Sequence, residues 1–292
     1  MLWQLTINGL IAGATYALIG VGFALIYNVA GFFHFAHGAI FTLGAYFAFF
    51  FSSKLGLPIF IFFPLAVGST ALIGCFLDVA IFAPLRRKNN SPLILLLASL
   101  GAYIILQNVV SIIFGDEIKT LRNGLVDSGI MIFEARITQV QIFIILVSIA
   151  ATSAIHVFLK NSKTGKAMRA ISCDPELSKI SGVDTEKTIF WTFGIGSALA
   201  SVAGILIALD VDMTPTMGMN ALMMGVVAVI IGGVGSVPGI ALGALFLGMA
   251  QHIGVWKISS QWQDAIAFLI LLIFLVVRPE GFMGKRIRRT TV

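Results

Sequence analysis

Long apolar stretches recur along the whole chain, and short polar segments separate them. Most of these stretches lie at about 5–27, 31–53, 58–83, 92–114, 137–159, 189–209 and 264–277. One more, over 221–255, is broken by glycines. Because a helix needs about 20 apolar residues to cross the hydrocarbon core of a bilayer, the pattern predicts an all-α, polytopic membrane protein. We expect about eight transmembrane helices that form a single transmembrane domain over residues 1–292.

The glycine-broken stretch differs from the others. Residues 221–231 are too short to cross a bilayer, and the sequence GGVGSVPG at 232–239 cannot continue as regular helix. Non-helical backbone survives at membrane depth only where protein or a water-filled cavity covers it. We therefore expect 221–255 to be a re-entrant segment or two short spans, and to line a translocation pathway.

The composition agrees with a membrane protein and excludes most soluble classes. Of the 292 residues, 58% are hydrophobic and 11% are charged, against roughly 45–50% and about 25% in soluble domains. Two cysteines, Cys75 and Cys173, are too few for a disulfide framework or a metal cluster. The sequences KTGK at 163–166 and GGVG at 232–235 lack the context of a phosphate loop or a dinucleotide site. We expect no nucleotide site in this chain and no nucleic-acid partner.

The basic residues orient the predicted spans. Most of the 19 lysines and arginines lie within 86–88, 160–187 and 278–289, and cytoplasmic loops carry such an excess. The number of spans between these segments agrees with that placement and puts 115–136 and 210–220 outside. The first apolar stretch has no basic segment before it and is long for a signal-peptide core, so we expect a retained span. The N-terminus is therefore predicted outside and the C-terminus in the cytoplasm.

Segment 165–187 is the largest polar feature of the chain. Asp174 is placed as the N-cap of a short helix, with Pro175 at its first position and Glu176 in its first turn. Gly182 is placed to end that helix, and an amphipathic piece precedes it. The pattern predicts a small helical shelf on the cytoplasmic face. Either its lysines hold it at the lipid headgroups, or it is the docking site of a cytoplasmic partner.

Few titratable groups lie within the spans. His34 and His37 are three residues apart at the start of the second span, which would place them on one helical face. No third ligand stands near them, so we favour hydrogen bonds to backbone carbonyls over a metal site or a proton relay. Asp78 is the one carboxylate clearly within a span, and we expect it either to pair with a basic neighbour or to reach the interface. Ion coupling is weakly supported, and the spans hold no arrangement typical of an enzyme.

Uncharged polar side chains also occur in the spans. They can hydrogen-bond either a polar solute or a neighbouring helix, and we favour the helix. These residues are Asn8, Thr15, Tyr16, Asn28, Gln107 and Asn108. Small residues at helical spacing allow helices to pack closely, and they are frequent in the first span and in the sixth.

Three motifs follow one another across nearly the whole chain. The first is NGLIAGATYALIGVGFALIYNVAGFFHFAHGAIFTLGAY at 8–46, and the second is GKAMRAISCDPELSKISGVDTEK at 165–187. The third is GGVGSVPGIALGALFLG at 232–248, which RPEGFMG follows at 278–284. In this order they resemble the permease subunits of branched-chain amino acid ABC importers, the hydrophobic amino acid uptake family. Two positions depart from the family pattern, because His34 and Asp174 stand where asparagine is usual.

The resemblance implies a multi-pass subunit of the bacterial inner membrane, surrounded by membrane lipid, that translocates branched-chain amino acids. It implies a second homologous permease, a periplasmic solute-binding protein and cytoplasmic ATPase subunits as partners. ATP would be bound by the ATPase subunits, so that this chain needs no cofactor. Two alternatives stay open, because relatives with this framework are similar to urea and short-amide importers, and because a stand-alone ion-coupled carrier would need no partner.

The resemblance also implies roles for particular residues. Segment 165–187 would be the coupling segment that is seated on an ATPase. The expected coupling residues are Gly165, Met168, Arg169, Asp174, Pro175 and Glu176. The expected residues of the translocation pathway are Tyr16, Asn28, His37, Gly38, Gly232, Gly233 and Gly235.

Overall fold

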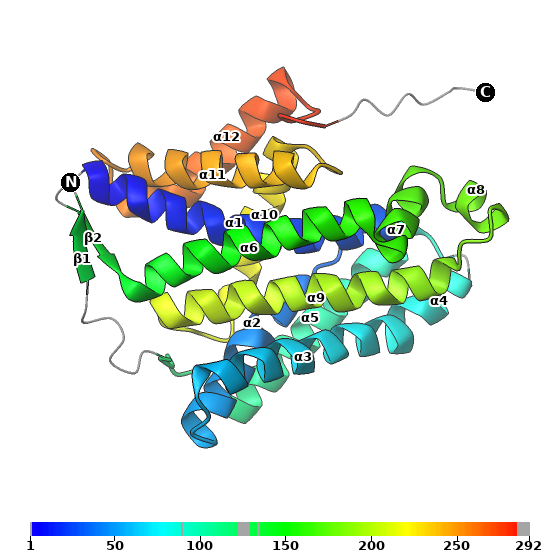
Figure 1. Cartoon of the computed structure of the whole chain (residues 1–292), viewed down its shortest axis with the longest axis horizontal. Helices are drawn as coiled ribbons and strands as arrows, with labels where there is room; N and C mark the ends of the chain where they lie inside the picture. The colour runs from blue at the N-terminus through cyan, green and yellow to red at the C-terminus, as the bar shows by residue number, and fades with distance from the viewer. Residues whose placement is uncertain (1, 89, 122–128, 133–134, 285–292) are drawn as a thin grey trace.

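The computed structural model describes every residue except 1, 89, 122–128, 133–134 and 285–292, and it is mostly helical (Figure 1). Its helices are α1 (Leu2–Ala30), α2 (Ala36–Phe49), α3 (Ile59–Leu77), α4 (Ala83–Arg87), α5 (Pro92–Phe114), α6 (Gln139–Asn161), α7 (Lys163–Cys173), α8 (Pro175–Ile180), α9 (Thr185–Asp210), α10 (Met217–Gly232), α11 (Val237–Gly254) and α12 (Gln263–Val277). Short π- or 3₁₀-helical turns extend some of them, namely η1 (Phe50–Lys54), η2 (Asp78–Phe82) and η3 (Ser260–Trp262). The strands β1 (Gly129–Ile132) and β2 (Ala135–Thr138) pair antiparallel.

The predicted fold class is confirmed. Within the described residues, 8 helical segments are long and apolar enough to cross a membrane. They are Leu2–Ala30, Ala36–Lys54, Ile59–Arg87, Pro92–Phe114, Gln139–Asn161, Thr185–Asp210, Val237–Gly254 and Ser260–Val277. The chain is therefore an all-α, multi-pass membrane protein, with α10 as an additional apolar helix of 16 residues.

The second span begins later than predicted. Gly31 has a φ of 74° and ends α1, with its N–H donating to the carbonyl oxygen of Tyr27 at 3.0 Å. Glycine adopts such a positive φ without the steric penalty that other residues meet. Because α2 starts only at Ala36, His34 lies in the link before the helix. The prediction that His34 and His37 share a helical face is therefore wrong.

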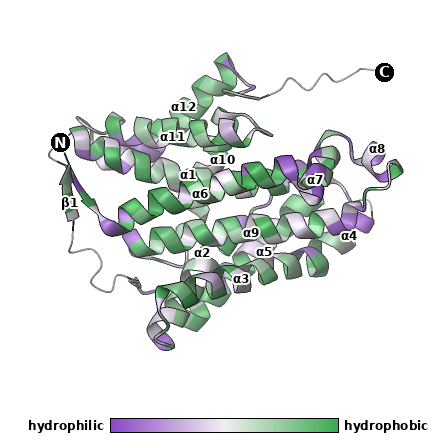
Figure 2. Ribbon diagram, in the orientation of Figure 1, coloured by the Kyte–Doolittle hydropathy of each residue, from purple (hydrophilic) through white to green (hydrophobic). Residues whose placement is uncertain are grey.

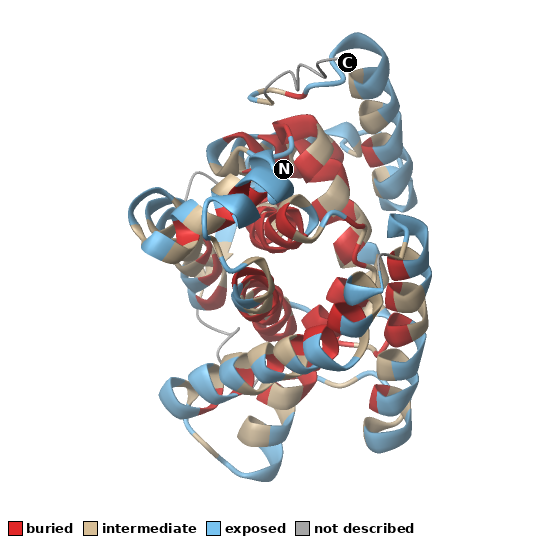
Figure 3. Cartoon of the chain, turned by 90° about the vertical axis from the view of Figure 1, so that its right-hand side faces the viewer, coloured by how far each residue is buried: buried red, intermediate tan, exposed pale blue. Residues whose placement is uncertain are grey.

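Helices α1 and α9 form the centre of the bundle. In the most apolar part of each span, 83% of the residues of α1 and 78% of those of α9 are buried, against 11% for α6 and 6% for the segment Ser260–Val277 that contains α12. Figure 3 shows the same division, with buried residues on the inner helices and exposed ones around them. The perimeter helices are apolar yet exposed, so their outward faces suit contact with lipid.

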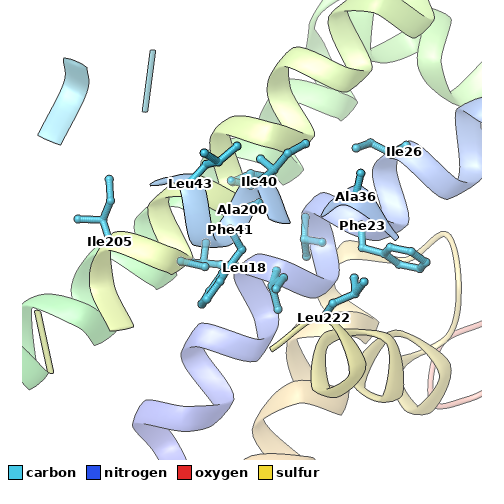
Figure 4. Packing of buried hydrophobic residues seen from close by; sticks show 14 of the residues in the cluster. Leu18, Phe23, Ile26, Ala36, Ile40, Phe41, Leu43, Ala200, Ile205 and Leu222 are labelled. Carbon is cyan, nitrogen blue, oxygen red and sulfur yellow. The ribbon is translucent and has the colours of Figure 1, made fainter. Parts of the chain in front are cut away.

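The inner helices pack through large apolar side chains and through glycines. Figure 4 shows Ile40 and Phe41 of α2 close to Leu18 of α1 and Ala200 of α9. Glycines set the spacing where α2 and α10 cross, because a Cβ atom at Gly38 would lie 2.7 Å from the carbonyl oxygen of Gly218. Close packing through small residues, as predicted, is therefore what this bundle uses.

The glycine-broken stretch forms two helices. α10 ends at Gly232, the turn 233–236 follows with positive φ at Gly233 and Gly235, and α11 begins at Val237. α11 runs antiparallel to α1, since Gly9 lies against Gly248 and Gly20 lies against Ile240. α10 instead passes across the direction of the long helices (Figure 1). The interruption lies where the sequence predicts it.

A leucine at Gly204 is expected to destabilise the protein. Gly204 of α9 lies directly against the carbonyl oxygen of Phe41 in α2, where a Cβ atom would collide with backbone. Overpacking of this kind costs about 1–3 kcal/mol or more. At roughly 2–4 °C per kcal/mol, a thermal-unfolding measurement in detergent should show a clear fall in Tm.

Gly68→Leu is the matched control for Gly204→Leu. Gly68 lies in α3, and a Cβ atom there would meet nothing within 4 Å. Glycine is about 0.8–1.0 kcal/mol less favourable than alanine in a helix, and leucine ranks just below alanine, so the Tm of this variant should stay the same or rise. Equal Tm values for the two variants would contradict the close α2–α9 crossing.

Candidate functional site

A small shelf of two helices stands at one end of the bundle. It consists of α7 and α8, and hydrophilic residues gather there and on nearby α4 (Figure 2). The predicted cap is confirmed, because Asp174 accepts a hydrogen bond from the N–H of Leu177 at 2.9 Å and Pro175 follows it at the start of α8. Ser162 caps α7 in the same way, accepting from the N–H of Gly165 at 2.9 Å. Both helices of the shelf thus start at defined residues.

One face of the shelf is anchored to the bundle. A Cβ atom at Gly165 would collide with the carbonyl oxygen of Phe158 in α6, so glycine lets α7 turn back closely onto α6. Met168 and Ile171 are buried, with 1% and 2% of their surface exposed. Of the expected coupling residues, Gly165 and Met168 therefore position the shelf from within.

The other face of the shelf is open. The remaining coupling candidates, Arg169, Asp174, Pro175 and Glu176, are all exposed. Two apolar side chains accompany them on α8, where Leu177 is 60% and Ile180 is 84% exposed. Charged and apolar groups thus share a surface that nothing in the described chain covers.

An ion-pair cluster connects the region beside the shelf to the core. Arg86 in α4 donates to Asp78 at 2.7 Å, and its second terminal nitrogen lies 3.4 Å from a carboxylate oxygen of Glu186 in α9. The side chain of Asp78 is 2% exposed and that of Arg86 is 12% exposed. The prediction that Asp78 pairs with a basic neighbour is confirmed. The cluster ties the end of the third span to the first turn of α9.

His34 and His37 are both fully buried, and their ring centroids lie 6.2 Å apart. The ring of His34 meets the rings of Phe82 and Phe193 edge-on at 5.1 Å, and neither of its nitrogens has a hydrogen-bond partner among the described residues. The expected hydrogen bond to a backbone carbonyl is therefore not present at His34. The ring of His37 lies against Gly22 of α1, and its nitrogens also have no hydrogen-bond partner among the described residues. No group of three or more metal-ligating side chains occurs within the described residues.

The structure does not bring the expected pathway residues into one site. His37 and Gly38 lie where α2 meets α1 and α10. Gly232 and Gly233 pack against α11 and the 281–284 segment, whereas Gly235 is in the turn with no atom within 4 Å of its Cβ position. The other two are on α1, with Tyr16 partly buried and Asn28 partly buried near its end.

Tyr16 lines a pocket of about 300 Å³ between α1, α6, α9 and α11. The lining residues are Asn8, Ile11, Ala12, Thr15, Tyr16, Gln141, Ile144, Ile207, Asp210, Val211 and His252. The sequence predicts that polar residues of α1 form hydrogen bonds, mostly with neighbouring helices. Those on α6, α9 and α11 were missed, because no local pattern connects helices so far apart in the chain.

The comparisons with known proteins decide the family. A family model described as a permease component of the branched-chain amino acid transport system matches residues 5–275. The chain belongs to this permease family. It is 33% identical to the high-affinity branched-chain amino acid transport system permease protein LivH of Salmonella typhimurium, over 97% of this chain and 95% of LivH. It is 31% identical to BraD of Pseudomonas aeruginosa, also named a high-affinity branched-chain amino acid transport permease, over the same shares.

The permease fold also has a solved counterpart. The structure of PsaBC from Streptococcus pneumoniae in complex with Fab superposes with a TM-score of 0.52, covering 94% of this chain and 91% of the other. At 16% identity the likeness concerns the fold alone. The matched region of the permease family includes both the shelf and the pocket, so both belong to the family domain.

Proposed function

We propose that this chain is the membrane permease subunit of an ABC importer that translocates branched-chain amino acids, namely leucine, isoleucine or valine. ATP is bound and hydrolysed by separate ATPase subunits, and the permease alternates between outward-open and inward-open states. The observation that carries the proposal is the α7–α8 shelf, together with membership of the permease family. Such a shelf offers a soluble partner a rigid surface through which to move the bundle.

The division of the shelf into two faces supports a coupling role. Met168 and Ile171 fix α7 to the bundle, so a force on the outer face reaches α6 and α9. Arg169 and Glu176 supply charges of both signs, and exposed Ile180 supplies an apolar anchor. Interfaces combine apolar anchors with a polar rim in this way. A loop held only at anionic lipid headgroups would be expected to carry basic side chains there, whereas Asp174 and Glu176 on the outer face are acidic.

The proposed topology follows the basic residues. The shelf and the C-terminus lie in the cytoplasm, the N-terminus lies outside, and the membrane is the bacterial inner membrane. The partners are two ATPase subunits on the cytoplasmic side, a periplasmic solute-binding protein on the other, and a second homologous permease within the membrane. Membrane lipid covers the exposed apolar faces of the perimeter helices.

The stand-alone carrier is less well supported. Ion-coupled carriers use ionisable groups within their spans. Among the described residues the clearly buried carboxylate of this kind is Asp78, and Arg86 already neutralises it at 2.7 Å. An importer of urea or short amides shares the framework and differs in the solute it carries, so a transport measurement must separate it.

The test is transport by the complete importer reconstituted into proteoliposomes, with the binding protein outside and ATP inside. We expect ATP-dependent uptake of leucine that ionophores do not abolish and no uptake of urea or acetamide. Uptake should cease when the phosphate loop of the partner ATPase is inactivated. Leucine uptake that persists after this inactivation would contradict the proposal, and so would uptake of urea in place of leucine.

A further inference from the structure

The pocket between α1, α6, α9 and α11 has the features of a small-molecule site. Its volume of about 300 Å³ is at the lower end of the range for ligand pockets. Its walls are mainly aliphatic, with Ile11, Ile144 and Ile207 on three different helices and Val211 just after the end of α9. Such pockets bind apolar groups and use a few polar side chains to orient the ligand.

The polar side chains of the pocket are held in place. The side-chain nitrogen of Gln141 donates to Asp210 at 3.3 Å, while its oxygen accepts from the N–H of Thr138 at 3.1 Å. Thr138 in turn caps α6 by accepting from the N–H of Gln141 at 3.2 Å. The capping box of α6 therefore orients a glutamine, and the glutamine orients the carboxylate of Asp210. Preorganised groups of this kind lower the cost of binding.

The charges of the pocket favour a ligand with an ammonium group. Of the described lining residues, Asp210 carries the only formal charge. It is also the last residue of α9, and the negative end of the helix dipole adds to its attraction for a cation. Asp210 accepts from Gln141 and takes part in a further interaction within the chain, but a carboxylate offers about four acceptor sites, so Asp210 can also accept hydrogen bonds from a ligand.

Asn8 supplies donors for an acidic group of the same ligand. Its side-chain oxygen accepts from Gln4 at 3.2 Å, which leaves its two amide hydrogens to donate. The lining thus includes a carboxylate for an ammonium group, an amide for a carboxylate group, and aliphatic side chains for an aliphatic one. A small aliphatic α-amino acid carries all of these groups.

We propose that this pocket is a binding site for the zwitterion of a branched-chain aliphatic amino acid within the permease. Asp210 receives the α-ammonium group, Asn8 receives the α-carboxylate, and the isoleucines of the walls contact the side chain. The proposal rests on the proposed function. It concerns a substrate site in the permease itself, which is distinct from the substrate site of the binding protein.

The test measures how far substrate protects an introduced cysteine from labelling by a maleimide. It uses the assembled complex without the binding protein. The variant Ala12→Cys places a thiol in the pocket, and Cys75→Ala with Cys173→Ala removes the native cysteines. Leucine at roughly ten times its apparent Kd should slow maleimide labelling about tenfold. Glutamate should not protect, and neither should 4-methylpentanoate, which is leucine without the ammonium group.

Asp210→Asn supplies the second measurement, with Asp212→Asn as its matched control. Asp212 is an exposed acid two residues away and does not line the pocket. In the Ala12→Cys background, Asp210→Asn should raise the half-protecting leucine concentration by about tenfold or more, since it removes a charge-assisted hydrogen bond. Asp212→Asn should leave that concentration unchanged. If Ala12→Cys prevents assembly of the complex, Ile207→Cys on the facing helix takes its place.

The outcomes separate this inference from the proposed function. Labelling that leucine does not slow, in a complex whose wild-type form imports leucine, would overturn the pocket and leave the importer in place. Equal effects of Asp210→Asn and Asp212→Asn would also overturn the role of Asp210. Protection by urea or acetamide instead of leucine, with no leucine uptake by the wild type, would overturn both.

Discussion

Arg169→Glu is expected to reduce uptake of branched-chain amino acids by about tenfold or more, because it reverses a charge on the surface proposed to dock an ATPase, where like charges placed together oppose binding. Arg169 is on the exposed side of α7. It lies between Met168 and Ile171, whose buried side chains anchor the helix to the bundle. A charge reversal there alters the proposed docking surface and leaves the core of the bundle intact. The measurement is uptake in proteoliposomes, together with the amount of ATPase that co-purifies with the tagged permease.

Lys54→Glu is the matched control for Arg169→Glu. It reverses the same charge at an exposed residue of η1, which lies far from the shelf (Figure 1). This variant should keep normal uptake and normal recovery of the ATPase, because an isolated surface charge contributes little to stability. Normal uptake by Arg169→Glu would remove Arg169 from the coupling surface, whereas poor recovery of the folded permease would show that its role is structural.

The positions of the helices were largely predictable because local sequence sets them. α5 was predicted over 92–114 and has those bounds, since Pro92 suits the first turn and Gly115 takes a φ of 81° just after the last residue. The start of α2 was not predictable from hydropathy, because the link after Gly31 is as apolar as a span. A backbone turn interrupts the helix there, and apolar periodicity does not report backbone dihedral angles.

In the candidate sites, too, features set by local sequence were predictable and features set by tertiary packing were not. The caps of the shelf were predictable because Asp174 and Leu177 are near neighbours in the chain. The inward face of α7 was not, since it depends on how α7 packs against α6 and α9. The pocket was less predictable still, because Gln141 and Asp210 meet only when α6 and α9 lie side by side. Contacts between distant helices depend on tertiary packing, and a single sequence does not encode that packing locally.

Asp78→Ala is expected to lower the free energy of unfolding by about 3–5 kcal/mol, as for other broken buried ion pairs. The substitution removes the carboxylate that lies 2.7 Å from Arg86, whose side chain is 12% exposed. An arginine cannot lose its charge to relieve this burial. At about 2–4 °C per kcal/mol, the Tm of the purified permease in detergent should fall by roughly 6–20 °C.

Three further variants isolate the cause of this loss. Arg86→Met should cost less than Asp78→Ala, because the carboxyl group left behind can take up a proton and become neutral. The double variant Asp78→Ala with Arg86→Met should recover most of the stability, since neither charge then remains buried. Glu186→Gln removes the charge of a carboxylate that is 40% exposed and lies 3.4 Å from Arg86 and 3.8 Å from Arg87, and should cost about 1 kcal/mol or less. If Asp78→Ala and Glu186→Gln have the same Tm, Asp78 is not needed to stabilise the buried charge of Arg86. Other contacts would then hold the third span to α9.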